Sequence, residues 1–262
     1  MGLPEVKVRL DLDQTVFTLL GPQLAEYKRL LPTFLEGLSA EEIALIADQE
    51  LRSDPHRPTR TFKREEDTVH FLGRPEFAIP WSTFAPIREE IIQSPDLMRN
   101  APLLPNVGTS LLQLPIEAYD TVRPDNDRTR KATQDSITNT GLPDKPLYMY
   151  VDTKDKATSI LNAIATDGTP RVLFDDSGAS LVRDIAQGNW SLNVLRKFAL
   201  VYFGATPQQL QSMENFTNGT IIPGIQLHAR THKLGFTVVQ MQRWEPEQMG
   251  GLQQFLSETL NI

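Results

Sequence analysis

The pattern of hydrophobic and polar positions alternates between strand-like and helix-like segments, most regularly after residue 100. Short runs of β-branched and aromatic residues predict strands, and longer segments with helical periodicity predict helices. The predicted strands cover 5–13, 115–122, 146–151, 171–176, 197–204 and 235–244. The predicted helices after residue 100 cover 125–141, 156–168, 178–188, 207–216 and 246–260. Strands that alternate with helices indicate an α/β fold, and the simplest arrangement is a single parallel sheet.

The segment that follows the first strand interrupts this alternation. Residues 21–51 have a helical pattern, whereas 52–80 are polar, charged and rich in proline. The second range predicts loops or short elements, and 81–99 is typical of an interrupted helix. We therefore expect an insertion between the first strand and the rest of the sheet.

Composition narrows the classes of function. The 262 residues include 26 Lys and Arg against 33 Asp and Glu, so the net charge is −7, and no general binding to nucleic acid or to an anionic membrane is expected. The absence of cysteine excludes disulfides, thiolate zinc sites and cysteine nucleophiles. We see neither a signal-peptide pattern nor an apolar run of membrane-spanning length, and we expect a soluble cytoplasmic protein.

Two pairs of aspartates follow two different predicted strands. Asp11 and Asp13 end the first strand, and Asp175 and Asp176 end the strand "RVLFDD". Ligands of open parallel sheets bind beyond the carboxyl ends of the strands, so both pairs are expected at one edge. Carboxylates that converge there repel one another unless a cation lies between them, and oxygen ligands favour Mg²⁺. Magnesium in turn points to phosphoryl chemistry.

A phosphoryl group is anionic and needs donors as well as a metal. Thr15 lies just past the first aspartate pair, and Thr121 lies at a strand end. Lys154 and Lys156 lie at the start of a predicted helix. A cation there opposes the helix dipole, so a lysine at that place is best explained if it faces an anion.

Four stretches together resemble the motifs of the haloacid dehalogenase (HAD) superfamily, namely "DLDQTV", "YDTVRP", "KDKATSI" and "VLFDDS". The resemblance covers residues 1–20 and about 100–204. It implies a HAD-like Rossmannoid core with a central parallel sheet. In this superfamily, insertions after the first strand commonly act as a cap over the active site.

The resemblance also implies catalytic roles. Asp11 resembles the nucleophile that forms an aspartyl-phosphate, and Asp13 resembles the general acid and base. Thr121 resembles the hydroxyl that holds the transferring group. Lys156 resembles the lysine that neutralises nucleophile and phosphate, with Lys154 as the second choice.

The same resemblance implies a Mg²⁺ site. Asp175 and Asp176 resemble the acidic pair that binds the metal, together with the side chain of Asp11 and the backbone carbonyl of Asp13. Members that carry Asp at the position of Asp13 transfer phosphate, so this residue favours a phosphatase or phosphotransferase over a dehalogenase. Arg123 is expected to be a further phosphate or substrate contact, as is Thr15.

The first strand departs from the family pattern, which is usually apolar throughout. Lys7 and Arg9 interrupt it, so either the start of the strand is exposed or these side chains reach partners. Gln14 stands where Gly is frequent.

We therefore expect a catalytic core of 1–20 and 100–262 and a mainly helical cap at 21–99. The predicted function is Mg²⁺-dependent hydrolysis of a phosphomonoester, either a small molecule or a phosphoprotein. The alternatives are a non-catalytic binding protein of the same fold and a phosphotransferase with an acceptor other than water. The sequence leaves the oligomeric state open.

Overall fold

A computed structural model gives the architecture of the chain. It describes residues 6–13, 15–18, 22, 39, 62–65, 68–71, 78–80, 82–83, 85–86, 90, 94–99, 101–203, 220–224, 227–231, 235–241 and 243–260. The strands are β1 (Lys7–Asp11), β2 (Phe62–Glu65), β3 (Thr68–Phe71), β4 (Ala78–Pro80), β5 (Ile116–Val122), β6 (Leu147–Tyr150), β7 (Arg171–Asp175), β8 (Phe198–Phe203), β9 (Thr220–Gly224), β10 (Leu227–Thr231) and β11 (Thr237–Met241). The helices are α4 (Pro95–Arg99), α5 (Val107–Leu111), α6 (Asp127–Asn139), α7 (Thr153–Asp167), α8 (Gly178–Gln187), α9 (Leu192–Leu195) and α11 (Pro246–Thr259).

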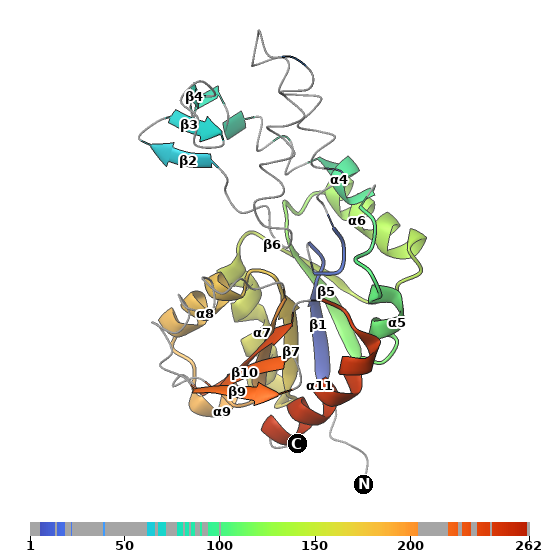
Figure 1. The fold of residues 1–262 in the computed structure, drawn as a ribbon, viewed down its shortest axis with the longest axis vertical. Helices are drawn as coiled ribbons and strands as arrows, with labels where there is room; N and C mark the ends of the chain where they lie inside the picture. The colour runs from blue at the N-terminus through green and yellow to red at the C-terminus, as the bar shows by residue number, and fades with distance from the viewer. Residues whose placement is uncertain are drawn as a thin grey trace. The chain divides into compact units, whose positions relative to one another are not determined.

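Within the described residues, one large sheet has the strand order β6-β5-β1-β7-β8-β11-β10-β9. The strands from β6 to β11 pair in parallel, and Figure 1 shows β5, β1 and β7 side by side. The predicted α/β class with a central parallel sheet is confirmed. At one edge, β10 and β9, which were not among the predicted strands, extend this parallel sheet in antiparallel pairing.

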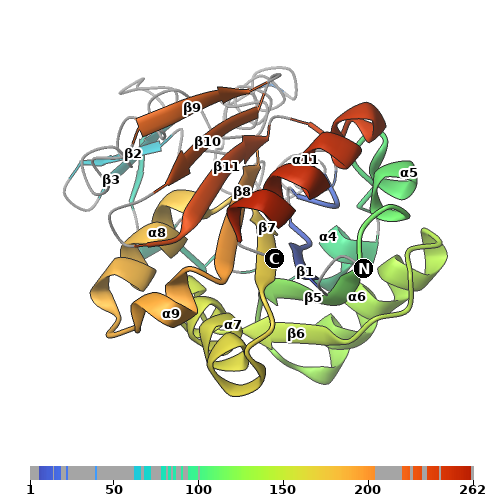
Figure 2. The same cartoon turned by 90° about the horizontal axis from the view of Figure 1, so that it is seen from below.

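Helices cover both faces of the sheet. Figure 2 shows α7, α8 and α9 on one side of it and α11 on the other. On the first side, Leu173, Leu200 and Val238 pack into a core with residues of the three helices. On the second side, Phe174 stacks on Trp244, which lies just before α11, with ring centroids 5.2 Å apart. The hydrophobic runs of β7 and β8 are explained by burial on both faces.

The chain divides into two compact units, the first comprising 1–17, 103–125 and 137–262, and the second comprising 18–102 and 126–136. Within the second unit, β2, β3 and β4 form a small antiparallel sheet, in a range predicted as loops or short elements. The helical pattern of 21–51 falls outside the described residues, apart from two single positions. The cap and its boundaries stay predictions.

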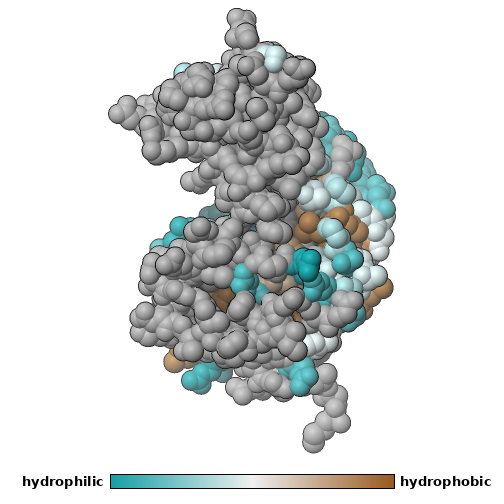
Figure 3. Space-filling model, viewed as in Figure 1, coloured by the Kyte–Doolittle hydropathy of each residue, from teal (hydrophilic) through white to brown (hydrophobic). Residues whose placement is uncertain are grey.

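The described surface is mixed in character. Figure 3 shows hydrophilic residues with smaller hydrophobic areas between them on the face that it presents. The large hydrophobic side chains exposed among the described residues are Leu112, Tyr148, Val151 and Leu192. No helix in the described part of the chain is long and apolar enough to cross a membrane.

Candidate active site

The carboxyl ends of three neighbouring strands carry polar side chains. Asp11 is the last residue of β1, Asp175 is the last of β7, and Thr121 is the last but one of β5. Strand β1 pairs in parallel with both β5 and β7, so these ends meet at one edge of the sheet. All three side chains are buried. The edge predicted from the sequence is therefore present, and these three side chains have little contact with water.

Lys156, in the first turn of α7, bridges two of these strand ends. Its Nζ donates hydrogen bonds to Oδ1 of Asp11 and to Oδ2 of Asp175, the latter at 2.7 Å. The side chain of Lys156 is only 1% exposed. The helix begins after Asp152, whose side chain accepts a hydrogen bond from the backbone N–H of Asp155. This cap fixes the turn that presents Lys156 to the carboxylates.

Burial and neighbouring charges both shift the pKa values of Lys156 and Asp11. Burial lowers the pKa of Lys156, but the carboxylates of Asp11 and Asp175 outweigh it and hold that pKa above its ordinary value. Burial raises the pKa of Asp11, Lys156 lowers it, and the neighbouring carboxylates raise it again, so it lies well above its ordinary value. One lysine thus faces more negative charge than it can balance.

Asp13 is held by a second set of donors. Nε of Arg123 donates to both of its carboxylate oxygens, at 2.8 and 3.2 Å, and Oγ1 of Thr121 donates to Oδ2 at 3.3 Å. Asp13 keeps 26% of its side chain exposed, whereas Arg123 is buried. In the described part of the chain, Nη1 of Arg123 is buried without a hydrogen-bond partner. Thr121 and Arg123 therefore converge on the second aspartate, not on the first.

Ser177, which lies just before α8, donates hydrogen bonds to the second acidic pair. The backbone N–H of Ser177 donates to Oδ1 of Asp175, and Oγ of Ser177 donates to Oδ1 of Asp176 at 3.3 Å. Asp176 is half-buried, and its charge is among those that act on Asp11. Both members of this pair are consequently near the proposed nucleophile.

Two further predicted residues lie differently. Lys154 is exposed, so the structure separates it from Lys156, which is buried. Thr15 is fully buried in the turn after β1, and its backbone carbonyl accepts a hydrogen bond of 2.6 Å from Nε1 of Trp244. Oγ1 of Thr15 has no hydrogen-bond partner within the described residues.

The carboxylate oxygens at this edge are the kind of ligand that a hard cation binds. Asp11, Asp175 and Asp176 offer carboxylate oxygens from two adjacent strand ends, and Asp11 is repelled by the other two. A divalent cation would relieve that repulsion. Across the ranges that the structure describes, no three His, Cys, Asp or Glu side chains are already grouped as a metal site.

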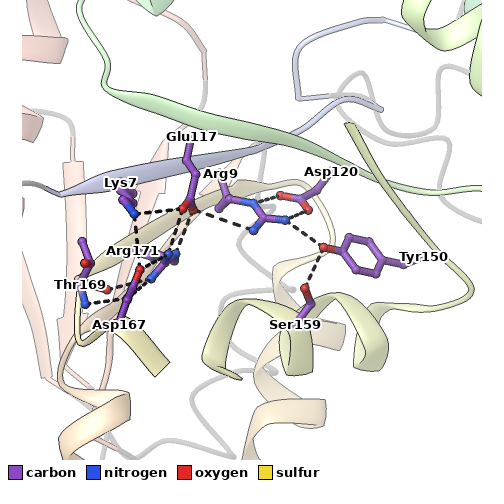
Figure 4. A network of polar contacts seen from close by, with 9 residues as sticks. All are labelled: Lys7, Arg9, Glu117, Asp120, Tyr150, Ser159, Asp167, Thr169 and Arg171. Carbon is purple, nitrogen blue, oxygen red and sulfur yellow. Dashed lines mark hydrogen bonds and ion pairs between the residues drawn. The ribbon is translucent and has the colours of Figure 1, made fainter. Parts of the chain in front are cut away.

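Lys7 and Arg9 reach partners inside the fold, which resolves the alternative that the sequence left open. Arg9 is buried and pairs with Asp120 of β5, its Nε donating to Oδ2 at 2.9 Å. Lys7 is within 3.5 Å of Glu117 and 3.4 Å of Asp167. Figure 4 shows the complete network, which comprises Lys7, Arg9, Glu117, Asp120, Tyr150, Ser159, Asp167, Thr169 and Arg171.

Asp120 was not among the predicted site residues, and it is fully buried one residue before Thr121. A signal was available, since a charged residue inside a strand predicted to be buried requires a partner, and Arg9 lies in another such strand. Ser177 was also missed, although Ser before a predicted helix is a usual N-cap.

No protein-family model matches the sequence, and a search of curated proteins finds no match. Among solved structures, a conserved haloacid dehalogenase-like protein of unknown function from Agrobacterium tumefaciens is 13% identical, with a TM-score of 0.45 over 96% of this chain and 98% of that one. A haloacid dehalogenase-like family hydrolase from Xanthomonas campestris is 10% identical, with a TM-score of 0.44 over 99% of each chain. The L-2-haloacid dehalogenase from Xanthobacter autotrophicus is 13% identical, with a TM-score of 0.34 over 84% of this chain and 85% of that one.

Proposed function

We propose that this chain is a HAD-type hydrolase, a magnesium-dependent phosphatase that cleaves phosphomonoesters through an aspartyl-phosphate on Asp11. One observation carries the proposal: a buried lysine joins the last residues of β1 and β7 by hydrogen bonds to their carboxylates. Burial and the neighbouring carboxylates raise the pKa of Asp11, and Lys156 opposes them, so it favours the ionised form that attacks phosphorus. The same cation would also balance charge on the transferring group.

The reaction is divided between the two aspartates of the first motif. A carboxylate oxygen of Asp11 attacks phosphorus, the bond to the ester oxygen breaks, and Asp13 gives its proton to the departing oxygen. A water molecule then attacks phosphorus and gives a proton to Asp13, and the bond between phosphorus and Asp11 breaks. The products are an alcohol and inorganic phosphate, and both aspartates return to their starting states.

Two buried donors without partners support an anionic ligand. Nη1 of Arg123 and Oγ1 of Thr15 are buried without partners in the described part of the chain. A buried polar group without a partner is costly, so an acceptor such as a phosphoryl oxygen would satisfy it. Arg123 already contacts Asp13, and Thr121 contacts the same carboxylate, so a phosphoryl group between the two aspartates would meet both donors.

Magnesium would be held by Asp11, Asp175 and Asp176 together with the backbone carbonyl of Asp13. When bound, it would neutralise charge on the phosphoryl oxygens. The substrate is a phosphorylated small molecule or a phosphoprotein.

The test is release of inorganic phosphate from an aryl phosphate, with Mg²⁺ and with EDTA, by the wild type, Asp11→Asn and Asp13→Asn. We expect activity only with Mg²⁺, none in Asp11→Asn, and a loss of about 10²- to 10⁴-fold in Asp13→Asn. Asp144→Asn is the matched control, because Asp144 is an exposed carboxylate and its change should leave activity intact. Full activity in Asp11→Asn would refute the nucleophile.

Three further measurements on the same protein separate the alternatives. Formation of an alkyl phosphate on addition of an alcohol would assign a phosphotransferase. Binding of Mg²⁺ without turnover across a panel of phosphate esters would assign a binding protein. Release of chloride from a 2-chloro acid, without phosphatase activity, would assign a dehalogenase.

A further inference from the structure

Arg9 lies in β1 two residues before Asp11, and its side chain is almost entirely buried. Its guanidinium group makes two hydrogen bonds to the carboxylate of Asp120 and a third, of 2.9 Å, to the hydroxyl oxygen of Tyr150. The guanidinium carbon also lies 4.5 Å from the ring centroid of Tyr148. Figure 4 shows Arg9 between Asp120 and Tyr150. The position of this side chain is therefore strongly determined.

Asp120 is placed where its charge can affect the candidate site. It is the register partner of Asp11 in the pairing of β1 with β5, and paired residues of parallel strands point to the same face. Asp120 is fully buried. After burial and the carboxylates of Asp11 and Asp175, its charge is the next influence on the pKa of Lys156. The charge of Asp120 thus acts on the ammonium group of Lys156 alongside the two carboxylates that bond to it.

Arg9 determines which of these carboxylates pair with Lys156. While Arg9 is present, both oxygens of Asp120 are engaged, and Lys156 bonds to Asp11 and Asp175. Without Arg9, Asp120 would be a buried carboxylate with no cation of its own, which is strongly unfavourable. Lys156 bonds to Asp11, the register partner of Asp120, and its charge interacts with that of Asp120, so Lys156 would be drawn away from Asp11.

A second contact fixes Arg9 relative to the same helix. The hydroxyl of Tyr150 accepts from Arg9 and donates to Oγ of Ser159 at 3.1 Å. Ser159 lies in α7, three residues after Lys156, so the two side chains are about one helical turn apart. The network in Figure 4 therefore connects the interior of β1 to the turn of α7 that follows the one carrying the lysine.

We propose that Arg9 is a positioning residue, which occupies Asp120 so that Lys156 remains paired with Asp11 and Asp175. The inference about the ion pairs rests on strand register, on the hydrogen bonds of Arg9 and Lys156, and on the charge of Asp120 next to them, and its consequence for catalysis rests on the proposed function. Arg9 does not touch the reacting atoms and acts through Asp120 and Lys156.

The test exploits the fact that two single variants break the same ion pair in different ways. Arg9→Met leaves a free carboxylate that competes for Lys156, whereas Asp120→Asn leaves none. We expect kcat for an aryl phosphate to fall about 10- to 100-fold in Arg9→Met with little change in KM, because the lysine is displaced. We expect kcat of Asp120→Asn, and of the double variant Arg9→Met/Asp120→Asn, to stay within about threefold of the wild type.

Crystal structures of the same variants give a readout that does not depend on activity. Nζ of Lys156 should contact Asp120 in Arg9→Met and return to Asp11 in the double variant. Lys7→Met is the control, since Lys7 lies on the same strand but pairs with Glu117 and Asp167, away from Lys156. It should leave both kcat and the lysine contacts unchanged.

A purely structural role predicts a different pattern, in which both single variants lose stability and kcat per folded molecule changes in neither or in both. That pattern, or Lys156 still bound to Asp11 in Arg9→Met, would overturn the proposal. If Arg9→Met does not fold, Arg9→Gln replaces it, and a large loss of kcat in Asp120→Asn alone would by itself refute the inference. If the wild type releases no phosphate, the proposed function fails, while the crystal structures still test the ion pairs.

Discussion

Replacement of Lys156 by Met removes the cation from between two buried carboxylates while it keeps most of the volume of the side chain. Lys156 is 1% exposed, Asp11 is 4% exposed and Asp175 is fully buried. Water therefore cannot easily compensate for the lost charge. Removal of one partner of a buried ion pair generally costs more than the pair contributed, because a charge is left unpaired in a medium of low polarity.

The size of the effect follows from this burial. Breaking a buried pair costs about 3–5 kcal/mol. For a chain of this length, each kcal/mol shifts the unfolding temperature by about 2–4 °C, so Lys156→Met should unfold about 6–20 °C below the wild type. The neighbouring Lys154 is exposed, and Lys154→Met should change stability by no more than about 0.5 kcal/mol.

The assay is thermal unfolding of the three proteins in the same buffer, followed by circular dichroism. EDTA is included so that a divalent cation does not replace the lost charge. Lys154→Met is the matched control for Lys156→Met, because the two lysines lie two residues apart in one helix turn and differ in burial. Equal unfolding temperatures for Lys156→Met and Lys154→Met would refute the buried ion pairs on which the site is built.

Two further predictions concern packing and charge elsewhere in the fold. Gly178→Ala should destabilise by about 1–3 kcal/mol, because the added Cβ would overlap the ring of Tyr202, whereas Gly250→Ala meets nothing within 4 Å in a helix and should stabilise by about 0.5–1 kcal/mol. Equal thermal unfolding of these two variants would contradict the close approach at Gly178. Arg171 donates hydrogen bonds to Asp167 and holds the pKa of that carboxyl below its ordinary value. The stability from this pair is present above pH about 4 and is lost as pH falls further. In urea unfolding, the free energy of unfolding of Arg171→Met should therefore lie below that of the wild type by an amount that shrinks between pH about 6 and about 3. A deficit that stays constant over this range would show that the pairing contributes nothing.

The sequence alone predicted the strands and helices whose hydrophobic patterns are regular. Strands β5, β7 and β8 and helices α7 and α8 appear where alternation and periodicity predicted them. Strands β9 and β10 were not predicted, because the segment around Pro223 and Gly224 lacks alternation and contains residues that usually interrupt strands. Their place in the sheet depends on the pairing of β10 with β11 and of β9 with β10, and the first of these is a tertiary contact that local sequence does not encode.

For the candidate site, the sequence indicated which residues converge but not how they pair. It ranked Lys156 first and Lys154 second from the family resemblance, and the helix phase gives an independent reason for the same order. Lys156 lies four and eight residues before Ile160 and Ile164, on the buried face of α7, and Lys154 does not. The pairing of Arg9 with Asp120 could not be read from the sequence, because the partners are 111 residues apart and meet only through strand register.

If Asp11 attacks phosphorus, the covalent intermediate can be trapped chemically. Asp13→Asn is mixed with an aryl phosphate, whose leaving group departs without a proton, and the reaction is stopped with acid. Peptide mass spectrometry should then find a phosphoryl group on Asp11, sensitive to hydroxylamine, because water attack is slowed in this variant. Phosphate release by the wild type, with no phosphoryl group on Asp11 in the trapped protein, would rule out Asp11 as the nucleophile.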